Sequence, residues 1–220
     1  MRDKLINKYL KYDIRTHDNE IDDRDTPDYW TDRALIEIEK VTGEYMYREF
    51  SDCNQYALIN EFLKVKDKTK VIVEIGVARV EGSVLYDHTS TTILINNKND
   101  DTIYLGIDIE DKTHLESERP NVYTLKAKSE DYDVILQKFK ELGITKIDFL
   151  FVDGWHSINQ VIDELWYVDY MKSGGIIGYH DTNYHPGPSR IINALKPDLF
   201  DVRKHCVSKI DWGVGFATIK

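Results

Sequence analysis

Residues 147–184 read IDFLFVDGWHSINQVIDELWYVDYMKSGGIIGYHDTNY and contain two apolar runs, each of which ends in polar side chains. The first run ends at Asp153 and His156, and the second ends at His180 and Asp181. Continuous apolar runs of this length are typical of strands buried on both faces, as in a parallel sheet. A helical segment separates the runs, so the stretch predicts a strand, helix, strand unit that carries two carboxylates and two imidazoles at its strand ends.

The same alternation extends in both directions from this unit. Further strands are predicted at KVIVEIG (70–76), TIYLGID (102–108) and NVYTLKA (121–127), and helical segments begin near Gly82, Glu130, Ser157 and Pro188. The tail differs, because FDVRKHCV (200–207) and WGVGFATIK (212–220) have no helix between them and predict an antiparallel hairpin. We therefore predict an α/β fold of the Rossmann-like, doubly wound type, mostly parallel, with an antiparallel C-terminal hairpin.

Residues 1–47 have a different character. They are charged and aromatic, with a helix predicted from Pro27 to Val41, and we interpret them as an accessory cap before a main domain at 48–220. Ser51 or Asp52 is the predicted cap of a second helix. The apolar stripe expected on that helix consists of Tyr56, Leu58, Ile59, Phe62 and Leu63.

Composition narrows the classes of partner. The chain has 220 residues, 41% of them hydrophobic, and a formal net charge of −10. This charge disfavours nucleic acid and anionic membranes as partners, since both require clustered Lys and Arg. No stretch has the apolar length of a membrane-spanning helix or a signal peptide, so a cytoplasmic location and a small-molecule ligand are expected.

Ligands of open α/β sheets bind outside the carboxyl ends of the strands. The side chains predicted at those ends are Glu74, Gly76, Asp108, Glu110, Ser129, Glu130, Asp153, Trp155, His156, His180, Asp181 and Asn183. Gly76 permits a tight turn, and Asp108 is placed to accept both hydroxyls of a ribose. Together they predict a nucleoside ligand. The sequence lacks the G-x-G-x-x-G of a dinucleotide site, and Glu74 would repel a phosphate, which favours a cofactor that is cationic or carries an amino group.

Asp153 and Asp181 also indicate a metal ion. Carboxylates at two adjacent strand ends are the hard oxygen ligands that Mg²⁺ needs. His180 adds an imidazole, which shifts the preference toward Mn²⁺, Fe²⁺ or Zn²⁺. The alternative is a purely structural pair of carboxylate and imidazolium that closes the two strand ends.

Taken together, EIGVAR, GS, GIDI, FVDGWHS and LWYVDYMKSGGIIGYHD resemble the class I S-adenosylmethionine-dependent methyltransferases. Within that class they look like the small metal-dependent O-methyltransferases that act on catechols, caffeoyl-CoA and sugars. The resemblance covers roughly residues 50–220 and implies the strand order 3-2-1-4-5-7-6. One departure is Val80, which stands where the family has its second glycine, so the turn carries an insertion before Gly82.

The resemblance implies a set of cofactor contacts. The first turn would hold the methionine part of S-adenosylmethionine, through Glu74, Gly76, Val77, Ala78, Gly82 and Ser83. Asp108 would bind the ribose, and Ser129 with Glu130 would read the adenine. Asp153 and Trp155 would border the cofactor, although Trp155 fits a core position equally well.

The resemblance also implies catalytic roles. Asp153, His180 and Asp181 fall on the family's three metal ligands, although the family usually has Asp-Asn or Asp-Asp where this chain has His180 and Asp181. His156 stands where the metal-dependent members carry the lysine base, and an imidazole can accept a proton at neutral pH. The alternative for His156 is a helix cap formed together with Ser157.

The function predicted from these residues is methyl transfer, with divalent-metal-assisted O-methylation of a small hydroxylated acceptor as the specific form. The acceptor is expected to be a sugar, a catechol-like compound or a natural-product hydroxyl, bound by residues 1–47 and 183–190. His185 with PGPSR (186–190) is predicted to form a rigid loop there. The rivals are a nicotinamide-dependent oxidoreductase and a non-catalytic protein that kept the fold. A homodimer remains open.

Overall fold

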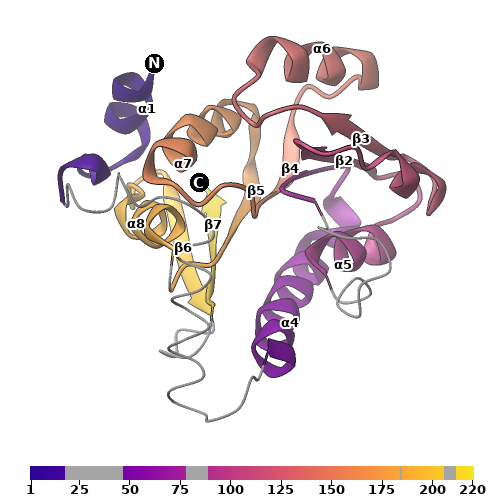
Figure 1. Ribbon diagram of the computed structural model, residues 1–220, viewed down its shortest axis with the longest axis horizontal. Coiled ribbons are helices and arrows are strands. Elements are labelled where there is room, and N and C mark those ends of the chain that lie inside the picture. The colour runs from indigo at the N-terminus through magenta and orange to yellow at the C-terminus, as the bar shows by residue number, and fades with distance from the viewer. Residues whose placement is uncertain (18–46, 78–88, 184, 206–211) are drawn as a thin grey trace.

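Seven strands form a single sheet in the order β3-β2-β1-β4-β5-β7-β6 (Figure 1). The computed structural model describes residues 1–17, 47–77, 89–183, 185–205 and 212–220, and the side chains of 16–17 and 47–53 are not described. The strands are β1 (Val71–Ile75), β2 (Ile103–Asp108), β3 (Val122–Lys126), β4 (Ile147–Val152), β5 (Met171–His180), β6 (Phe200–His205) and β7 (Val214–Ile219). The α-helices are α1 (Arg2–Tyr9), α4 (Tyr47–Val65), α5 (Ser90–Asn97), α6 (Tyr132–Leu142), α7 (Ile158–Glu164) and α8 (Pro186–Ala194).

The first five strands run parallel, and β7 runs in the opposite direction between β5 and β6. β1 lies between β2 and β4 and pairs parallel with both. β2 also pairs parallel with β3, and β4 pairs parallel with β5. β7 then pairs antiparallel with both β5 and β6. These pairings confirm the predicted fold class and strand order. They bring the carboxyl ends of β1 to β5 to one edge of the sheet, which is where the polar strand ends lie.

The two faces of the sheet are covered by different helices, as Figure 1 shows for α7 and α8 on one side and α4 and α5 on the other. Val73 and Ile75 of β1 pack in one buried cluster with residues of α1, α6, α7 and α8. Ile72, the residue before Val73, packs in a second cluster with residues of α4 and α5. Successive side chains of a strand point to opposite faces, so one apolar run supplies both cores.

Helix α4 corrects two predictions. It includes residues 47–50, so neither Ser51 nor Asp52 can be its N-cap. Tyr56 and Leu63 of the predicted stripe are 69% and 48% exposed. The buried face has helical spacing but includes two polar residues, so an apolar pattern alone does not reveal it. Its members are Asn54, Ala57, Leu58, Glu61 and Phe62. Glu61 can be buried there because Arg203 of β6 and Lys64 form ion pairs with its carboxylate.

Residues 1–17 pack onto the face that carries α7 and α8. Leu5, Ile6 and Tyr9 of α1 are buried in the same cluster as the sheet. Ile14 begins a short 3₁₀ helix, η1 (Ile14–His17), and its carbonyl accepts a hydrogen bond from Arg190 of α8 at 3.0 Å. The predicted helix Pro27–Val41 lies outside the described residues, so the cap and its boundary at residue 47 stay predictions.

Two further boundaries differ from prediction. β5 begins at Met171, three residues before the double glycine of the predicted strand. α8 begins at Pro186, so PGPSR is the start of a helix rather than a loop, with proline in its first turn. Within the described ranges, no helix is both long enough and apolar enough to cross a membrane.

Candidate functional site

Gly76 joins the ends of β1 and β4. Its amide donates to the carbonyl of Ile107, and the amide of Asp153 donates to the carbonyl of Ile75 at 2.8 Å. Gly76 has a φ of +77°, and a Cβ there would lie 2.0 Å from the carbonyl oxygen of Asp153. Only glycine fits this combination of backbone angle and close approach. The Gly76 turn, which the sequence predicted to contact the cofactor, therefore lies directly against the backbone of Asp153.

Glu74 is fully buried on the face of the sheet that α5 covers. Its carboxylate accepts a hydrogen bond from Ser90 at 2.5 Å and another from the hydroxyl of Tyr104. Burial raises the pKa of Glu74 to about 7, and the hydrogen bonds from Ser90 and Tyr104 oppose that rise. The structure thus gives both oxygens of Glu74 protein partners, of which the sequence predicted neither.

Asp108 connects two of the predicted cofactor segments. One carboxylate oxygen accepts the amide of Val77 at 2.8 Å, and the other accepts the amide of Glu110 at 2.8 Å. A carboxylate oxygen has further lone pairs, so these bonds orient Asp108 without saturating it. The side chain is half-buried at the carboxyl edge. Ala78, Gly82 and Ser83, predicted for the same turn, lie outside the described residues.

Ser129 and Glu130, in the loop after β3, belong to a polar network with side chains of α7. The Ser129 hydroxyl donates to Glu164 at 2.7 Å, and the amide of Gln160 donates to both Ser129 at 2.6 Å and Glu130 at 2.9 Å. Burial raises the pKa of Glu164 to about 8. Its Oε2 is buried without a hydrogen-bond partner. Gln160 and Glu164, one turn apart on α7, were missed from sequence because their helical spacing reads as surface polarity.

Three side chains predicted as metal ligands lie together where β4 and β5 end. The Nδ1 of His180 is 3.2 Å from Oδ1 of Asp153 and 3.0 Å from Oδ1 of Asp181. Their ligand atoms all lie within 4.8 Å of one another. Asp181 has a φ of +59°, a left-handed conformation that is uncommon outside glycine and concentrates at functional sites. The end of β5 thus turns sharply to present this carboxylate.

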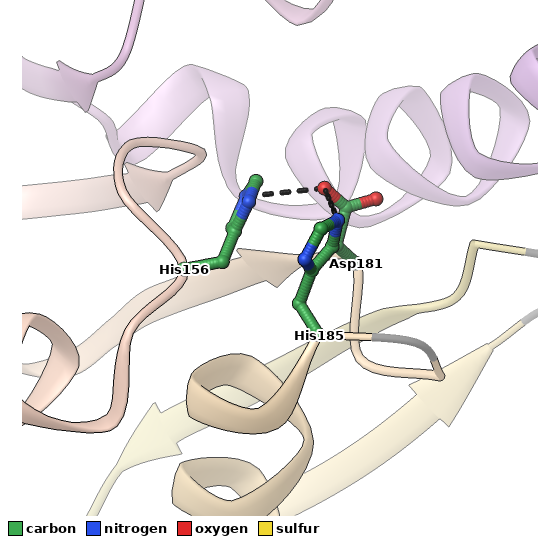
Figure 2. A group of neighbouring side chains, drawn as sticks. All are labelled: His156, Asp181 and His185. Atoms are coloured by element: carbon green, nitrogen blue, oxygen red, sulfur yellow. Dashed lines mark ion pairs between the residues drawn. The ribbon is translucent and has the colours of Figure 1, made fainter. Parts of the chain in front are cut away.

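Two more imidazoles approach the other oxygen of the Asp181 carboxylate (Figure 2). The Nε2 of His156 lies 3.1 Å from Oδ2 of Asp181 and 3.5 Å from Oδ1 of Asp153. The Nε2 of His185 lies 3.6 Å from Oδ2 of Asp181. The rings of His156 and His185 stack with centroids 4.1 Å apart. His185 was not predicted as part of this cluster, although its spacing four residues after Asp181 was a signal.

Charge stabilises the ionised form of both aspartates. Burial, the largest single effect, would raise the pKa of Asp153 and of Asp181, but the charge of His180 together with the charges and hydrogen bonds of the neighbouring histidines outweighs it, and both pKa values are lowered. Burial alone would lower the pKa of His180, yet the charges of Asp181 and Asp153 raise that pKa well above its ordinary value. Burial lowers the pKa of His185 to about 4, so this ring is neutral at physiological pH. The two carboxylates therefore attract a cation at this position.

The donor set fits a divalent ion. Two carboxylates and three imidazoles converge within a few ångström, which are the ligand types of Mg²⁺, Mn²⁺ and the transition metals. Three of the converging atoms, His156 Nε2, His180 Nδ1 and Asp181 Oδ1, are buried and lack a hydrogen bond of acceptable geometry. Such atoms need a partner, and a coordinated ion supplies one. Trp155, the residue before His156, is 49% exposed, which excludes the core position that its sequence also allowed.

The sheet order and the antiparallel hairpin are those of class I S-adenosylmethionine-dependent methyltransferases, and solved structures of such enzymes share this fold. The chain is similar to the methyltransferase MycE of the mycinamycin biosynthetic pathway, solved with Mg, SAH and mycinamycin VI, with a TM-score of 0.51 and 16% identity. That match covers 73% of this chain and 47% of MycE, so the chain spans about half the length of that protein.

A second similar structure matches over nearly its whole length. CalS11, a TDP-rhamnose 3'-O-methyltransferase of calicheamicin biosynthesis, has a TM-score of 0.51 and 14% identity, with 81% of this chain and 90% of CalS11 covered. No protein-family model and no curated protein sequence matches the chain. At these identities the likeness establishes the fold.

Proposed function

We propose that this chain is an S-adenosylmethionine-dependent methyltransferase that methylates a hydroxyl oxygen of a small molecule with the help of a divalent cation. The observation that carries the proposal is the cluster of Asp153, His156, His180 and Asp181 at the sheet edge where this fold binds its cofactor. Gly76 connects the cluster with the cofactor-binding edge, because the turn at Gly76 lies against the backbone of Asp153. A methyl donor beside Asp153 would then face the cluster.

The cofactor would be held by the strand ends. Asp108 would accept the hydroxyls of the ribose while its bonds to Val77 and Glu110 keep it oriented. Ser129 and Glu130 would face the adenine, fixed from behind by Gln160. Glu74 would act on the methionine part only through its neighbours, since its carboxylate is fully buried against Ser90 and Tyr104.

The acceptor would be activated by the cluster. Asp153, His180 and Asp181 would hold the cation, with Mg²⁺ or Mn²⁺ favoured by the two carboxylates and Fe²⁺ or Zn²⁺ made compatible by His180. When bound, such an ion lowers the pKa of a hydroxyl that coordinates it and fixes its direction. His156 would take the hydroxyl proton at Nε2, with Asp153 and Asp181 stabilising the imidazolium that forms.

The acceptor class follows from the open side of the site. The net charge of −10 disfavours strongly anionic partners, and the exposed Trp155, next to His156 in the sequence, would offer an aromatic face to the acceptor. A sugar ring has hydroxyls for the cation and apolar C–H faces for an aromatic ring. MycE and CalS11 are named for a mycinamycin and a TDP-rhamnose substrate, which supports a sugar hydroxyl as the first acceptor to test.

The decisive experiment measures formation of S-adenosylhomocysteine with sugar, sugar-nucleotide and catechol acceptors, with and without EDTA. We expect EDTA and Asp181→Ala each to abolish turnover while cofactor affinity is retained. His156→Ala should keep the metal and lose roughly 10²- to 10⁴-fold in rate, the usual share of a positioned general base. Asp198→Ala, an exposed aspartate before β6 at the opposite edge of the sheet, is the control and should behave as wild type.

Three results would contradict the proposal. Turnover that resists EDTA but requires His156 would replace the metal by a metal-free histidine base. Cofactor binding without methyl transfer to any acceptor would indicate a non-catalytic protein that kept the fold. Binding of NAD in place of S-adenosylhomocysteine would indicate an oxidoreductase.

A further inference from the structure

The two oxygens of Asp181 face different sets of side chains. Oδ1 lies 3.0 Å from Nδ1 of His180, on the side of Asp153. Oδ2 lies 3.1 Å from Nε2 of His156 and 3.6 Å from Nε2 of His185. One carboxylate therefore takes part in two groups of potential ligands, and the second group contains a residue, His185, that has no place in the proposed reaction.

The second group has the composition and burial of a transition-metal site. His156, Asp181 and His185 are 7%, 5% and 1% exposed, and their ligand atoms lie within 4.8 Å of one another. They come from the loop after β4, the end of β5 and the residue before α8, and Figure 2 shows both imidazoles directed at the carboxylate. The Nε2 of His156 is buried without a hydrogen bond of acceptable geometry. Two imidazoles and one carboxylate suit Zn²⁺, Fe²⁺ or Co²⁺ better than Mg²⁺.

Charge limits how many ions the five residues can hold together. The cluster of Asp153, His156, His180, Asp181 and His185 contains two carboxylates, which balance one divalent ion. A second ion at the shared Asp181 would bring uncompensated charge into a buried site, which is strongly unfavourable. The two groups are therefore alternative positions for a single ion.

We propose that the chemical softness of the ion selects its position: Mg²⁺ or Mn²⁺ binds to Asp153, His180 and Asp181, whereas Zn²⁺ binds to His156, Asp181 and His185. Zn²⁺ at the second position occupies Nε2 of His156. In the proposed function, on which this consequence rests, the same nitrogen accepts the proton of the substrate. Zn²⁺ bound there would therefore inhibit the Mg²⁺- or Mn²⁺-dependent reaction.

Metal binding to the metal-free chain of 220 residues tests the two positions without any assay of activity. Calorimetric titration with Zn²⁺ and with Mn²⁺ is compared for wild type, His185→Gln and Asp153→Asn. We expect His185→Gln to weaken Zn²⁺ binding by at least 10- to 100-fold, the loss seen even for changes behind the ligands, while Mn²⁺ binding persists. Asp153→Asn should instead weaken Mn²⁺ binding while Zn²⁺ binding persists. Equal effects of each variant on both ions would overturn the proposal.

A measurement on wild type covers the case in which a variant fails to fold. In chain labelled with ¹⁵N-histidine, Zn²⁺ should shift the Nε2 signals of His156 and His185. A shift of His180 with His156 and His185 unchanged would overturn the proposal.

The kinetic consequence is separable from the binding. If Mn²⁺-supported turnover is found, Zn²⁺ should inhibit wild type at concentrations about tenfold or more below those needed for His185→Gln, matching the loss of affinity. Equal inhibition of both proteins would overturn the inhibitory role. Absence of turnover with every acceptor would refute the proposed function alone, because the binding and spectroscopic results decide the metal positions by themselves.

Discussion

At the scale of single residues, Gly76 carries a constraint that no other residue type satisfies. Its φ of +77° and the 2.0 Å that would separate a Cβ from the carbonyl oxygen of Asp153 are independent reasons for glycine. Gly143, which ends α6, has a similar φ of +68°, but a Cβ there would have no atom within 4 Å. Comparing substitutions at Gly76 and Gly143 therefore separates the free-energy cost of the backbone angle from that of the close approach to Asp153.

Gly76→Ala should therefore destabilise the protein far more than Gly143→Ala. The left-handed angle alone costs about 1–2 kcal/mol for alanine, which is the expected loss at Gly143. At Gly76 the ends of β1 and β4 must also separate, and we expect a loss of more than about 4 kcal/mol, a range reached by steric defects in cores. Urea unfolding of both variants measures the difference. Similar losses would show that the Asp153 carbonyl moves aside easily.

Glu164 gives a pH dependence whose sign can be worked out. Its pKa is raised from 4.5 to about 8 because burial disfavours the charged carboxylate. Between those values the folded protein holds a proton that the unfolded chain releases, so this group's contribution to stability falls as pH rises from about 4.5 to about 8. The loss amounts to at most about 5 kcal/mol, at 1.36 kcal/mol per pH unit.

Glu164→Gln should remove this dependence because an amide stays neutral. The unfolding free energy of the variant relative to wild type should increase from about pH 5 to about pH 8. Taking this difference also cancels the opposite effect of His185, whose lowered pKa costs stability as pH falls below 6.5. Urea unfolding across that range is the measurement, with the exposed Glu141→Gln as control. A difference independent of pH would mean that Glu164 is ionised in the folded protein.

At the scale of elements, α1 belongs to the core despite its distance in sequence from the sheet. Arg2 donates from Nε and Nη2 to the two carboxylate oxygens of Asp163 on α7, at 2.8 and 2.7 Å. Leu5 and Ile6 are 6% and 5% exposed. Since an ion pair that is partly exposed contributes little, the buried apolar side chains supply most of the docking energy.

Ile6→Ala should cost about 2–5 kcal/mol of unfolding free energy, the range for removing a large aliphatic side chain from a core. Lys4→Ala, on the exposed side of the same helix, should stay within about 0.5 kcal/mol of wild type. Chemical unfolding of the two variants tests the docking of α1. Losses of equal size would mean that the helix is detached from the core in solution.

At the scale of the whole molecule, the sheet order decides where a cofactor can bind, since it brings five carboxyl strand ends to one edge. S-Adenosylhomocysteine at 100 times its dissociation constant should raise the unfolding free energy by about 2.7 kcal/mol, and NAD at the same concentration should not. Asp108→Asn should weaken the nucleoside by about 1–3 kcal/mol. The exposed Asp111→Asn is the matched control. Stabilisation by NAD alone would contradict the cofactor assignment.

The sequence by itself determined the sheet and the strand ends. Apolar runs, their alternation with helices and the final hairpin depend on local pattern, so the predicted strands agree with the observed ones to within a few residues. Because parallel strands end at one edge, the pattern also indicated that Asp153, His156, His180 and Asp181 would lie together, as they do. Their roles in binding and catalysis stay predictions.

Only the tertiary structure decided which other residues join them. His185 approaches Asp181 because α8 begins one residue later, and Gln160 and Glu164 reach Ser129 because α7 packs on one face of the sheet. Glu61 is buried on α4 because Arg203 arrives from a strand more than a hundred residues away. A polar side chain reads as solvent-exposed in a local pattern, and what buries it is a partner brought by long-range packing, which a local pattern does not contain.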